Sequence, residues 1–404
     1  MIREAPCAGR NRAMTVYTPE QFLALDQFVK RVRLRLNLSH RPFVDHYYAS
    51  GEWCKLYFNL DNEGSITATY GLESLRFEYH GREVKVGIGS SLYSIEAGAG
   101  LYLYRRAGDS CPVTLLFGGS PDAHKLVRLL GWTYYSGVKV YVINKTYEAY
   151  PGDKWFRLAA KSVARRIARR KLSLYAPRVP LEIRKRISVQ EEQSFDKDLL
   201  PPESPFTFRF APSAEYLNWR YNTQLSFVRY RLFRILESGR TAGYVFINEM
   251  PEKLIVAQCD GIDPRSLAYG TLLSVLQAGR EDREPRSVVL TSCHPVMQKI
   301  YESFGFQPEP EDRPFCLGAT NGPADIAPDT SNWLINFDWG DNGLRAPFLD
   351  QVETENDPGK TADPVGKTPF KLDKERQHGG DGATPTPAPA ARPSYASIIR
   401  PNAQ

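Results

Sequence analysis

The sequence has no long apolar run, no closely spaced cysteine pair and no cluster of histidines. No hydrophobic stretch approaches the roughly 18 residues that a helix needs to cross a bilayer. The N-terminal stretch MIREAPCAGRNR has no hydrophobic segment of the signal-peptide kind. These absences argue against a transmembrane helix, and we expect a cytoplasmic protein.

The cysteines and histidines are too scattered to suggest a disulfide framework or a metal site. The six cysteines are Cys7, Cys54, Cys111, Cys259, Cys293 and Cys316. Most stand in apolar, strand-like contexts and none forms a C-x-x-C pair. We expect reduced core residues and predict no metal site.

The composition is that of a folded protein. The chain has 404 residues, of which 42% are hydrophobic and 12% aromatic. This is enough for two or three domains with their own cores, and it excludes a fully disordered chain. The formal charge of +6 is mild, so its local distribution matters more than its size.

One pattern occurs twice. FGGSPDAHKLVRLLGW at 117–132 and VVLTSCHPVMQKIYESFGF at 288–306 each combine an apolar strand, a small-residue turn, a short helix and an aromatic residue after glycine. Upstream of each copy, a β-rich stretch precedes a turn that opens a helix, at 96–106 and 263–277. Two copies predict two like domains.

The strand patterns predict an α+β fold with two mixed, mostly antiparallel sheets flanked by helices. In the first repeat, strands are expected at 54–60, 65–71, 74–79, 84–95, 113–117 and 137–144. In the second repeat, they are expected at 227–236, 241–248, 253–260 and 287–292.

These patterns divide the chain into four parts. The first domain is expected at 14–150, a basic interdomain helix and linker at 151–194, and the second domain at 195–340. The segment 341–404 contains TPTPAPAARP and too little apolar surface to offset the entropy of ordering, so we expect a disordered tail.

The arrangement resembles the GNAT superfamily of acyl-CoA-dependent acyltransferases over about residues 67–317. In that family a turn of the form Gln/Arg-x-x-Gly-x-Gly/Ala binds the pyrophosphate of coenzyme A. The resemblance implies acyl transfer from acetyl-CoA or another acyl-CoA by two GNAT-like domains, without a metal.

The resemblance assigns the donor turn to the second repeat. Arg265, Ala268, Tyr269 and Gly270 match the family turn, although a plain helix start would explain them equally. Unpaired amides at a helix N-terminus bind phosphate oxygens.

The first repeat offers Gly98 and Gly100 at the equivalent turn. Ile95 stands where the family has Gln or Arg, and no cation follows closely. The first repeat is therefore predicted to be degenerate.

The resemblance also implies catalytic residues. Tyr301 stands where these enzymes place the acid that protonates the departing thiolate, whereas the first repeat has Val127 there. Asp260 is the candidate base, with Glu249 as second choice. A core tyrosine and a solvated carboxylate are the structural alternatives.

Two further stretches suggest a subgroup. AEYLNWRYN at 214–222 and SNWLINFDWGDNG at 331–343 look like bacterial tandem GNAT proteins associated with cell-envelope polysaccharide synthesis. This implies N- or O-acylation of a sugar or amine acceptor. The alternatives are a Fem-type aminoacyl transferase and a non-catalytic scaffold or regulator of glycan assembly.

A basic stretch lies between the repeats. KWFRLAAKSVARRIARRK begins at Lys154 and ends at Lys171, with an apolar stripe opposite a purely cationic face. Such a helix fits an anionic membrane surface. A solvated interdomain helix is the structural alternative, and nucleic acid is a weaker candidate partner. The oligomeric state stays open.

Overall fold

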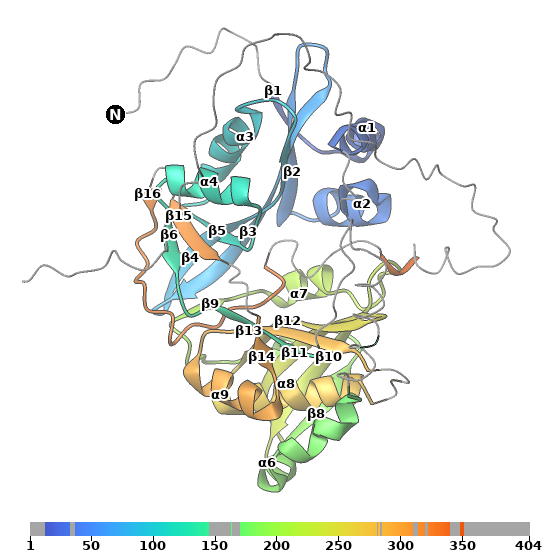
Figure 1. Cartoon of the computed structure of the whole chain (residues 1–404), viewed down its shortest axis with the longest axis vertical. Helices are drawn as coiled ribbons and strands as arrows, with labels where there is room; N and C mark the ends of the chain where they lie inside the picture. The colour runs from blue at the N-terminus through green and yellow to red at the C-terminus, as the bar shows by residue number, and fades with distance from the viewer. Residues whose placement is uncertain are drawn as a thin grey trace, which may run out of the picture. The chain divides into compact units, whose positions relative to one another are not determined.

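The computed structural model describes residues 13–32, 37–144, 163, 170–280, 282, 285–309, 314–319, 322–339 and 348–350. All of them belong to one unit, Met1–Asp357. The described strands form two mixed sheets with helices against them, which confirms the predicted α+β class (Figure 1). No described helix is both long and apolar enough to span a lipid bilayer.

The first sheet is built mainly from the N-terminal half. Its elements are β1 (Ala13–Val16), α1 (Phe22–Val32), α2 (Arg41–Ala49), β2 (Cys54–Leu60), β3 (Ile66–Tyr79), β4 (Arg82–Ser94), α3 (Ala99–Gly108), β5 (Val113–Phe117), α4 (Pro121–Leu129) and β6 (Thr133–Tyr135). The sheet order is β1-β2-β3-β4-β5-β15-β16, with β6 on β15 and β9 on β3. Side chains of α1 and α2 pack in one core cluster and those of α3 and α4 in another. These helix pairs cover opposite faces of the sheet (Figure 1).

The second sheet has the order β14-β7-β13-β12-β11-β10-β8. The elements of this half are β7 (Lys139–Ile143), η3 (Leu172–Arg178), α6 (Leu181–Arg186), β8 (Ile187–Glu192), β9 (Phe208–Phe210), α7 (Ala214–Arg220), β10 (Tyr230–Glu237), β11 (Arg240–Met250), β12 (Lys253–Gly261), α8 (Pro264–Ala278), β13 (Ser287–Ser292), α9 (Pro295–Phe304), β14 (Gln307–Pro308), β15 (Phe315–Ala319) and β16 (Gly322–Pro323). Helices α8 and α9 share a core cluster on one face of this sheet.

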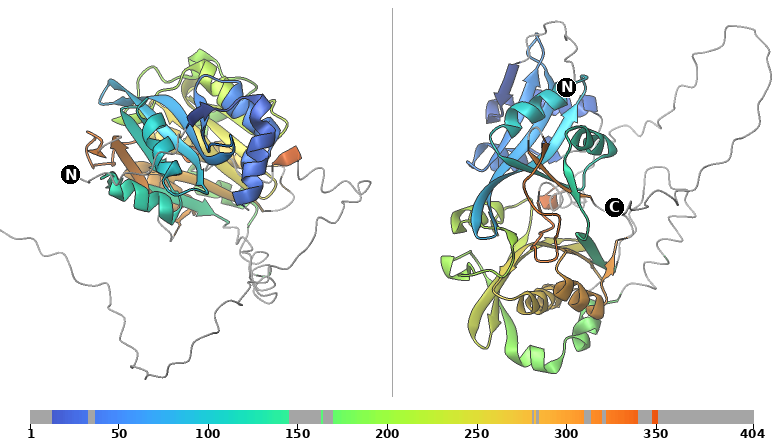
Figure 2. Two further views of the ribbon diagram at one scale, coloured as in Figure 1. Left: turned by 90° about the horizontal axis from the view of Figure 1, so that it is seen from above. Right: turned by 90° about the vertical axis from the view of Figure 1, so that its left-hand side faces the viewer.

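The two halves exchange a strand. β7 lies between β13 and β14 in the second sheet, and β15 lies between β5 and β6 in the first. Figure 2 lets the exchange be followed by colour, with β7 in green-teal and β15 in orange. The strand predicted at 137–144 therefore exists, but the expectation that it closes the first domain's sheet is corrected. Neither sheet is complete without a strand from the other half.

Some of the predicted divisions fall outside the described residues. The basic stretch 154–171 is described only at residues 163, 170 and 171, and the expected tail only at 348–350. The stretch predicted as a linker, 151–194, also contains β8, an edge strand of the second sheet that pairs with β10. The domain boundaries stay predictions, because the strand exchange leaves no single cut between the sheets.

Candidate functional site

The first sheet splits between β4 and β5. The two strands pair in parallel only at 86–88 and 113–115. Beyond that point β4 continues along β3 as far as Ser94, and β5 continues along β15 as far as Phe117. The strands therefore separate, each held by its outer neighbour.

The backbone of β4 is irregular beside this split. Thr69 pairs with Tyr93 and Gly71 pairs with Ser90, so Ser91 and Leu92 together stand opposite Tyr70. Ser91 has a φ of 49°, which is uncommon for a residue other than glycine. Such a β-bulge takes one residue out of the ladder and re-aims the strand.

A cavity of about 160 Å³ lies in the split. It is lined by 89–93 of β4, 114–117 of β5, residues of α4 and its N-terminal turn, and the side chains of Tyr70, Tyr104, Trp132 and Trp339. The lining is mainly apolar and aromatic, with serine and threonine hydroxyls among it. This is the usual make-up of a small-molecule site.

One residue that lines this cavity, Tyr70, has a buried polar atom without a partner among the described residues. The hydroxyl of Tyr70 has no hydrogen bond to any described residue. Burial raises the pKa of Tyr70 well above its usual value. Buried hydroxyls in proteins nearly always have a partner, so an unmatched one in a residue that lines a cavity indicates room for a polar atom of a ligand or water.

The helix that follows β4 begins without a side-chain cap. Gly98 is the N-cap of α3, with a φ of 79° and no side-chain hydrogen bond to the first turn. A Cβ atom built on Gly100 would meet Leu92 and Ser94 at an ordinary 3.5 Å. Gly98 is exposed and Gly100 half-buried. The first turn of α3 therefore presents backbone that an anion can approach.

The second sheet has a matching split. β12 and β13 pair in parallel only at 253–255 and 287–289. Phe246 pairs with Gln258 and Ile247 with Val256, so Ala257 bulges from β12. Each half thus has a bulged strand beside a diverging parallel neighbour.

This second split is bridged by residues 333–339, which we call the closing segment. On the β12 side, the side-chain amide of Asn336 exchanges hydrogen bonds of 2.9 and 3.2 Å with the backbone of Cys259. On the β13 side, the hydroxyl of Thr291 donates to the carbonyl of Ile335 at 3.1 Å. The backbone amide of Asp338 also donates to the carbonyl of Ala257, the bulged residue of β12. In the second sheet, the closing segment therefore occupies the split that corresponds to the cavity of the first sheet.

The turn predicted to bind pyrophosphate is already capped by an acid. α8 begins at Pro264, and Oδ2 of Asp263 accepts the amide of Ser266 at 2.7 Å. The Ser266 hydroxyl donates to Glu237 at 2.8 Å. Asp263 therefore caps one backbone amide of this helix start, and its negative charge opposes the approach of a diphosphate.

The other residues predicted for this turn are divided between core and surface. Ala268 and Gly270 are buried, and a Cβ atom on Gly270 would lie 2.5 Å from Ile235. Arg265 is exposed, with its guanidinium 5.9 Å from the ring centre of Tyr269. Donor binding here stays a prediction that the packing does not favour.

The two predicted catalytic residues point to opposite faces of the second sheet. Tyr301 is 1% exposed in the cluster that contains Cys259, and burial raises the pKa of its phenol. Asp260 follows Cys259 in β12 and so points to the other face. Its Oδ2 atom is 2.6 Å from Nη1 of Arg209. Burial raises the pKa of Asp260 to about 6, against the lowering effect of Arg209.

Glu249, the second candidate for the base, also forms an ion pair. Oε1 of Glu249 lies 2.8 Å from Nη1 of Arg286. The predicted residues of the second half are thus structural partners in this conformation. Their assignment to catalysis stays a prediction.

The stretch AEYLNWRYN at 214–222, which contains α7, has a structural explanation in Arg220. Arg220 is 2% exposed and lies between Glu73 of β3 and Asp338 of the closing segment, at 3.5 and 3.3 Å. Its guanidinium also stacks over the ring of Tyr47. This cluster joins the first sheet, α2 and the closing segment.

Sequence reasoning gave Tyr70 no role, and it included Trp339 only as part of the stretch 331–343. Tyr70 is one of several aromatic residues in strand patterns, and nothing local marks its orphaned hydroxyl. The second helix start carried a usable signal, because Asp followed by Pro before an apolar run is typical of a capped helix. That signal favours the structural explanation of 263–270.

No family model matches the chain, and no curated protein matches it. Among solved structures, it is similar to a GCN5-related N-acetyltransferase from Kribbella flavida, with 11% identity over 77% of this chain and 72% of that one, at a TM-score of 0.47. It is also similar to a probable N-acyltransferase from Enterococcus faecalis, with 10% identity over 78% and 73% and a TM-score of 0.45. A tandem GNAT protein from the clavulanic acid biosynthesis pathway matches with 14% identity over 78% and 100% and a TM-score of 0.45.

Proposed function

We propose that the protein is an acyl-CoA-dependent acyltransferase whose donor lies in the split of the first sheet. The observation that carries the proposal is the coincidence there of a cavity, a bulged strand and an uncapped helix start. The turn at Gly98 and Gly100 would hold the pyrophosphate, and the pantetheine chain would run between β4 and β5. The acyl group would then lie in the cavity.

The chemistry needs a polarised thioester and a free nucleophile. A β-bulge leaves an amide outside the ladder, and the proposal places that amide of β4 on the thioester oxygen. The acceptor atom attacks the carbonyl carbon, the carbon–sulfur bond breaks, and the acceptor's proton ends on the thiol of coenzyme A.

The lining favours an amine as acceptor. None of the described residues that line the cavity is a carboxylate, a histidine, a lysine or an arginine. An amine that is already neutral can attack without a strong base, whereas a hydroxyl needs one. We therefore propose N-acylation of an amine, and amino sugars are one acceptor class compatible with the sugar or amine acceptor that the sequence resemblance implies.

The test is acetyl-CoA binding by calorimetry with three variants. Gly100→Glu should weaken binding at least about tenfold by placing a negative charge at the helix start. Gly100→Gln is the uncharged control of equal size and should bind normally. Arg265→Glu changes an exposed residue at the other turn and should leave affinity unchanged. Loss of binding in Arg265→Glu alone would place the donor in the second half.

The same lining favours a second candidate, a non-catalytic acyl-CoA-binding protein that acts as a scaffold or regulator. A cavity without an acid–base residue suits binding better than turnover. Thiol release with a panel of amino sugars separates the two. Donor binding without any thiol release would favour the scaffold.

A further inference from the structure

One residue lining the cavity comes from far along the chain. All the other described lining residues lie between Tyr70 and Trp132, whereas Trp339 belongs to the closing segment. That segment bridges the split of the second sheet, so its last residue reaches the cavity of the first. The two splits are connected through seven residues of chain.

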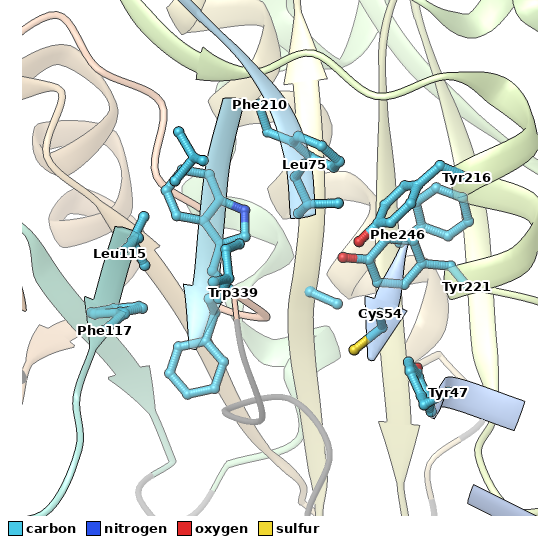
Figure 3. Packing of buried hydrophobic residues seen from close by; sticks show 14 of the residues in the cluster. Tyr47, Cys54, Leu75, Leu115, Phe117, Phe210, Tyr216, Tyr221, Phe246 and Trp339 are labelled. Carbon is cyan, nitrogen blue, oxygen red and sulfur yellow. The ribbon is translucent and has the colours of Figure 1, made fainter. Parts of the chain in front are cut away.

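The residues that line the cavity come from both faces of the first sheet. Along β5, Leu116 packs in the cluster under α3 and α4, whereas Leu115 and Phe117 belong to the cluster on the opposite face. Trp339 is in that second cluster. Figure 3 shows its indole beside Leu115 and Phe117. A chain entering from the helix side would therefore meet this indole.

Trp339 is held firmly. Its ring packs edge-to-face on Phe77, with the ring centres 4.9 Å apart, and it is 3% exposed. The preceding residue, Asp338, donates its amide to Ala257 and pairs with Arg220. A large ring fixed by such contacts cannot move aside cheaply, because protein interiors are close-packed.

We infer that Trp339 is the specificity-determining residue that limits the length of the acyl group. This rests on the proposed function, since it needs the acyl end of the donor to lie in the cavity. The wild-type protein then accepts short acyl groups, and the limit is imposed by the second half through the closing segment.

The experiment measures affinity for acetyl-, butyryl-, hexanoyl- and octanoyl-CoA by calorimetry. In the wild type, affinity should stop rising or fall beyond the short chains. In Trp339→Ala, each added methylene should improve affinity by about fourfold while the new space lasts, the usual gain for a buried methylene. Hexanoyl-CoA should therefore gain at least about tenfold over acetyl-CoA relative to the wild type.

A matched control separates this effect from general loosening of the core. Trp333 is 1% exposed in the same segment and does not line the cavity. Trp333→Leu and Trp339→Leu remove similar volume, and only Trp339→Leu should change the chain-length profile. Thermal melting checks that both variants are folded.

The outcomes separate the inference from the proposed function. If no acyl-CoA binds the wild type, the proposed function and the inference both fail. If acetyl-CoA binds but the Trp339 variants keep the wild-type profile, only the inference is overturned. A wild type whose affinity rises steadily to octanoyl-CoA would also overturn it, without any variant.

Discussion

Arg220 and Asp338 form an ion pair inside the protein, with Nη2 and Oδ2 3.3 Å apart and neither side chain more than 2% exposed. Glu73 lies 3.5 Å from Nε of the same guanidinium. The pair connects α7 to the closing segment, and through Glu73 to the first sheet. Removing one partner of such a pair leaves a buried charge without full compensation.

We therefore predict that Arg220→Met destabilises the protein by roughly 3–5 kcal/mol. The double variant Arg220→Met with Asp338→Asn should lose clearly less than the sum of the single losses, because no charge remains at Asp338. Urea unfolding of the four proteins in a double-mutant cycle measures the coupling. Additive losses would show that the two side chains do not interact.

The strand exchange predicts that neither half folds alone. A fragment ending at residue 144 carries β7 without its partners β13 and β14, and its own sheet lacks β15. Both exposed edges would be open to aggregation. Circular dichroism and hydrogen exchange on the fragment should show little protected structure. Co-expression with a fragment covering the rest of the chain should restore it.

A cooperative melt of the isolated fragment would contradict this prediction. Co-expression of the two fragments is the control for the chain break after residue 144, because together they contain every strand of the exchange. A stable complex of the two fragments would show that the break alone does not prevent folding.

The local parts of the fold were predictable, and the exchange was not. Turn residues and apolar alternation mark β4, α3 and β5 within a few residues of their bounds, since both signals are local. The same alternation marked the strand at 139–143, but a strand pattern does not state which neighbour it pairs with. Its partner β13 lies more than a hundred residues away, and only the folded chain specifies it.

In the candidate site, too, the local features were predictable from the sequence and the tertiary ones were not. The turn of Gly98 and Gly100 was visible in the sequence, and Ile95 led to the prediction of a degenerate first repeat, which stays a prediction. The stretch 331–343 was noted only as a subgroup motif, whereas its residues 333–339 bridge the second split. Whether a distant segment fills a split depends on tertiary packing, and residue spacing in the sequence does not predict it.

The buried carboxylate of Asp260 should make stability depend on pH. Its pKa is raised from an ordinary value near 4 to about 6, chiefly by burial. A raised carboxyl pKa means that the folded state holds the proton more tightly, so this stability is present below about pH 4 and lost as the pH rises to about 6. The contribution is at most about 3 kcal/mol.

Asp260→Asn should remove this dependence between pH 4 and 6. Chemical unfolding at intervals across that range, for wild type and variant, provides the measurement. Arg209 keeps Glu78 as a partner in the variant, with Nη2 and Oε2 2.6 Å apart. Identical pH profiles for the two proteins would assign the dependence to other groups.

Tyr301 offers a test of which half performs the chemistry. If the donor lies in the first split, Tyr301→Phe should leave turnover within about twofold, because the phenol is buried in the other half. If the second half is catalytic, the loss of its acid should lower turnover about 10²- to 10⁴-fold with little change in donor affinity. Steady-state thiol release with the preferred acceptor decides between them.

Tyr70→Phe tests the cavity itself, because its hydroxyl is buried without a partner among the described residues. A buried hydroxyl that makes no hydrogen bond costs about 1–3 kcal/mol in the folded state, and phenylalanine fills nearly the same space. The free variant should therefore be as stable as the wild type or more stable in urea unfolding. If the hydroxyl hydrogen-bonds the donor, acetyl-CoA affinity should fall about tenfold, the effect of losing one such bond.

A variant that is less stable without ligand would mean that the hydroxyl already has a partner, such as a buried water, in the free protein. If the variant binds acetyl-CoA as tightly as the wild type, the hydroxyl of Tyr70 does not contact the donor. Retained stability together with weaker binding is the result expected for a hydroxyl that hydrogen-bonds the ligand.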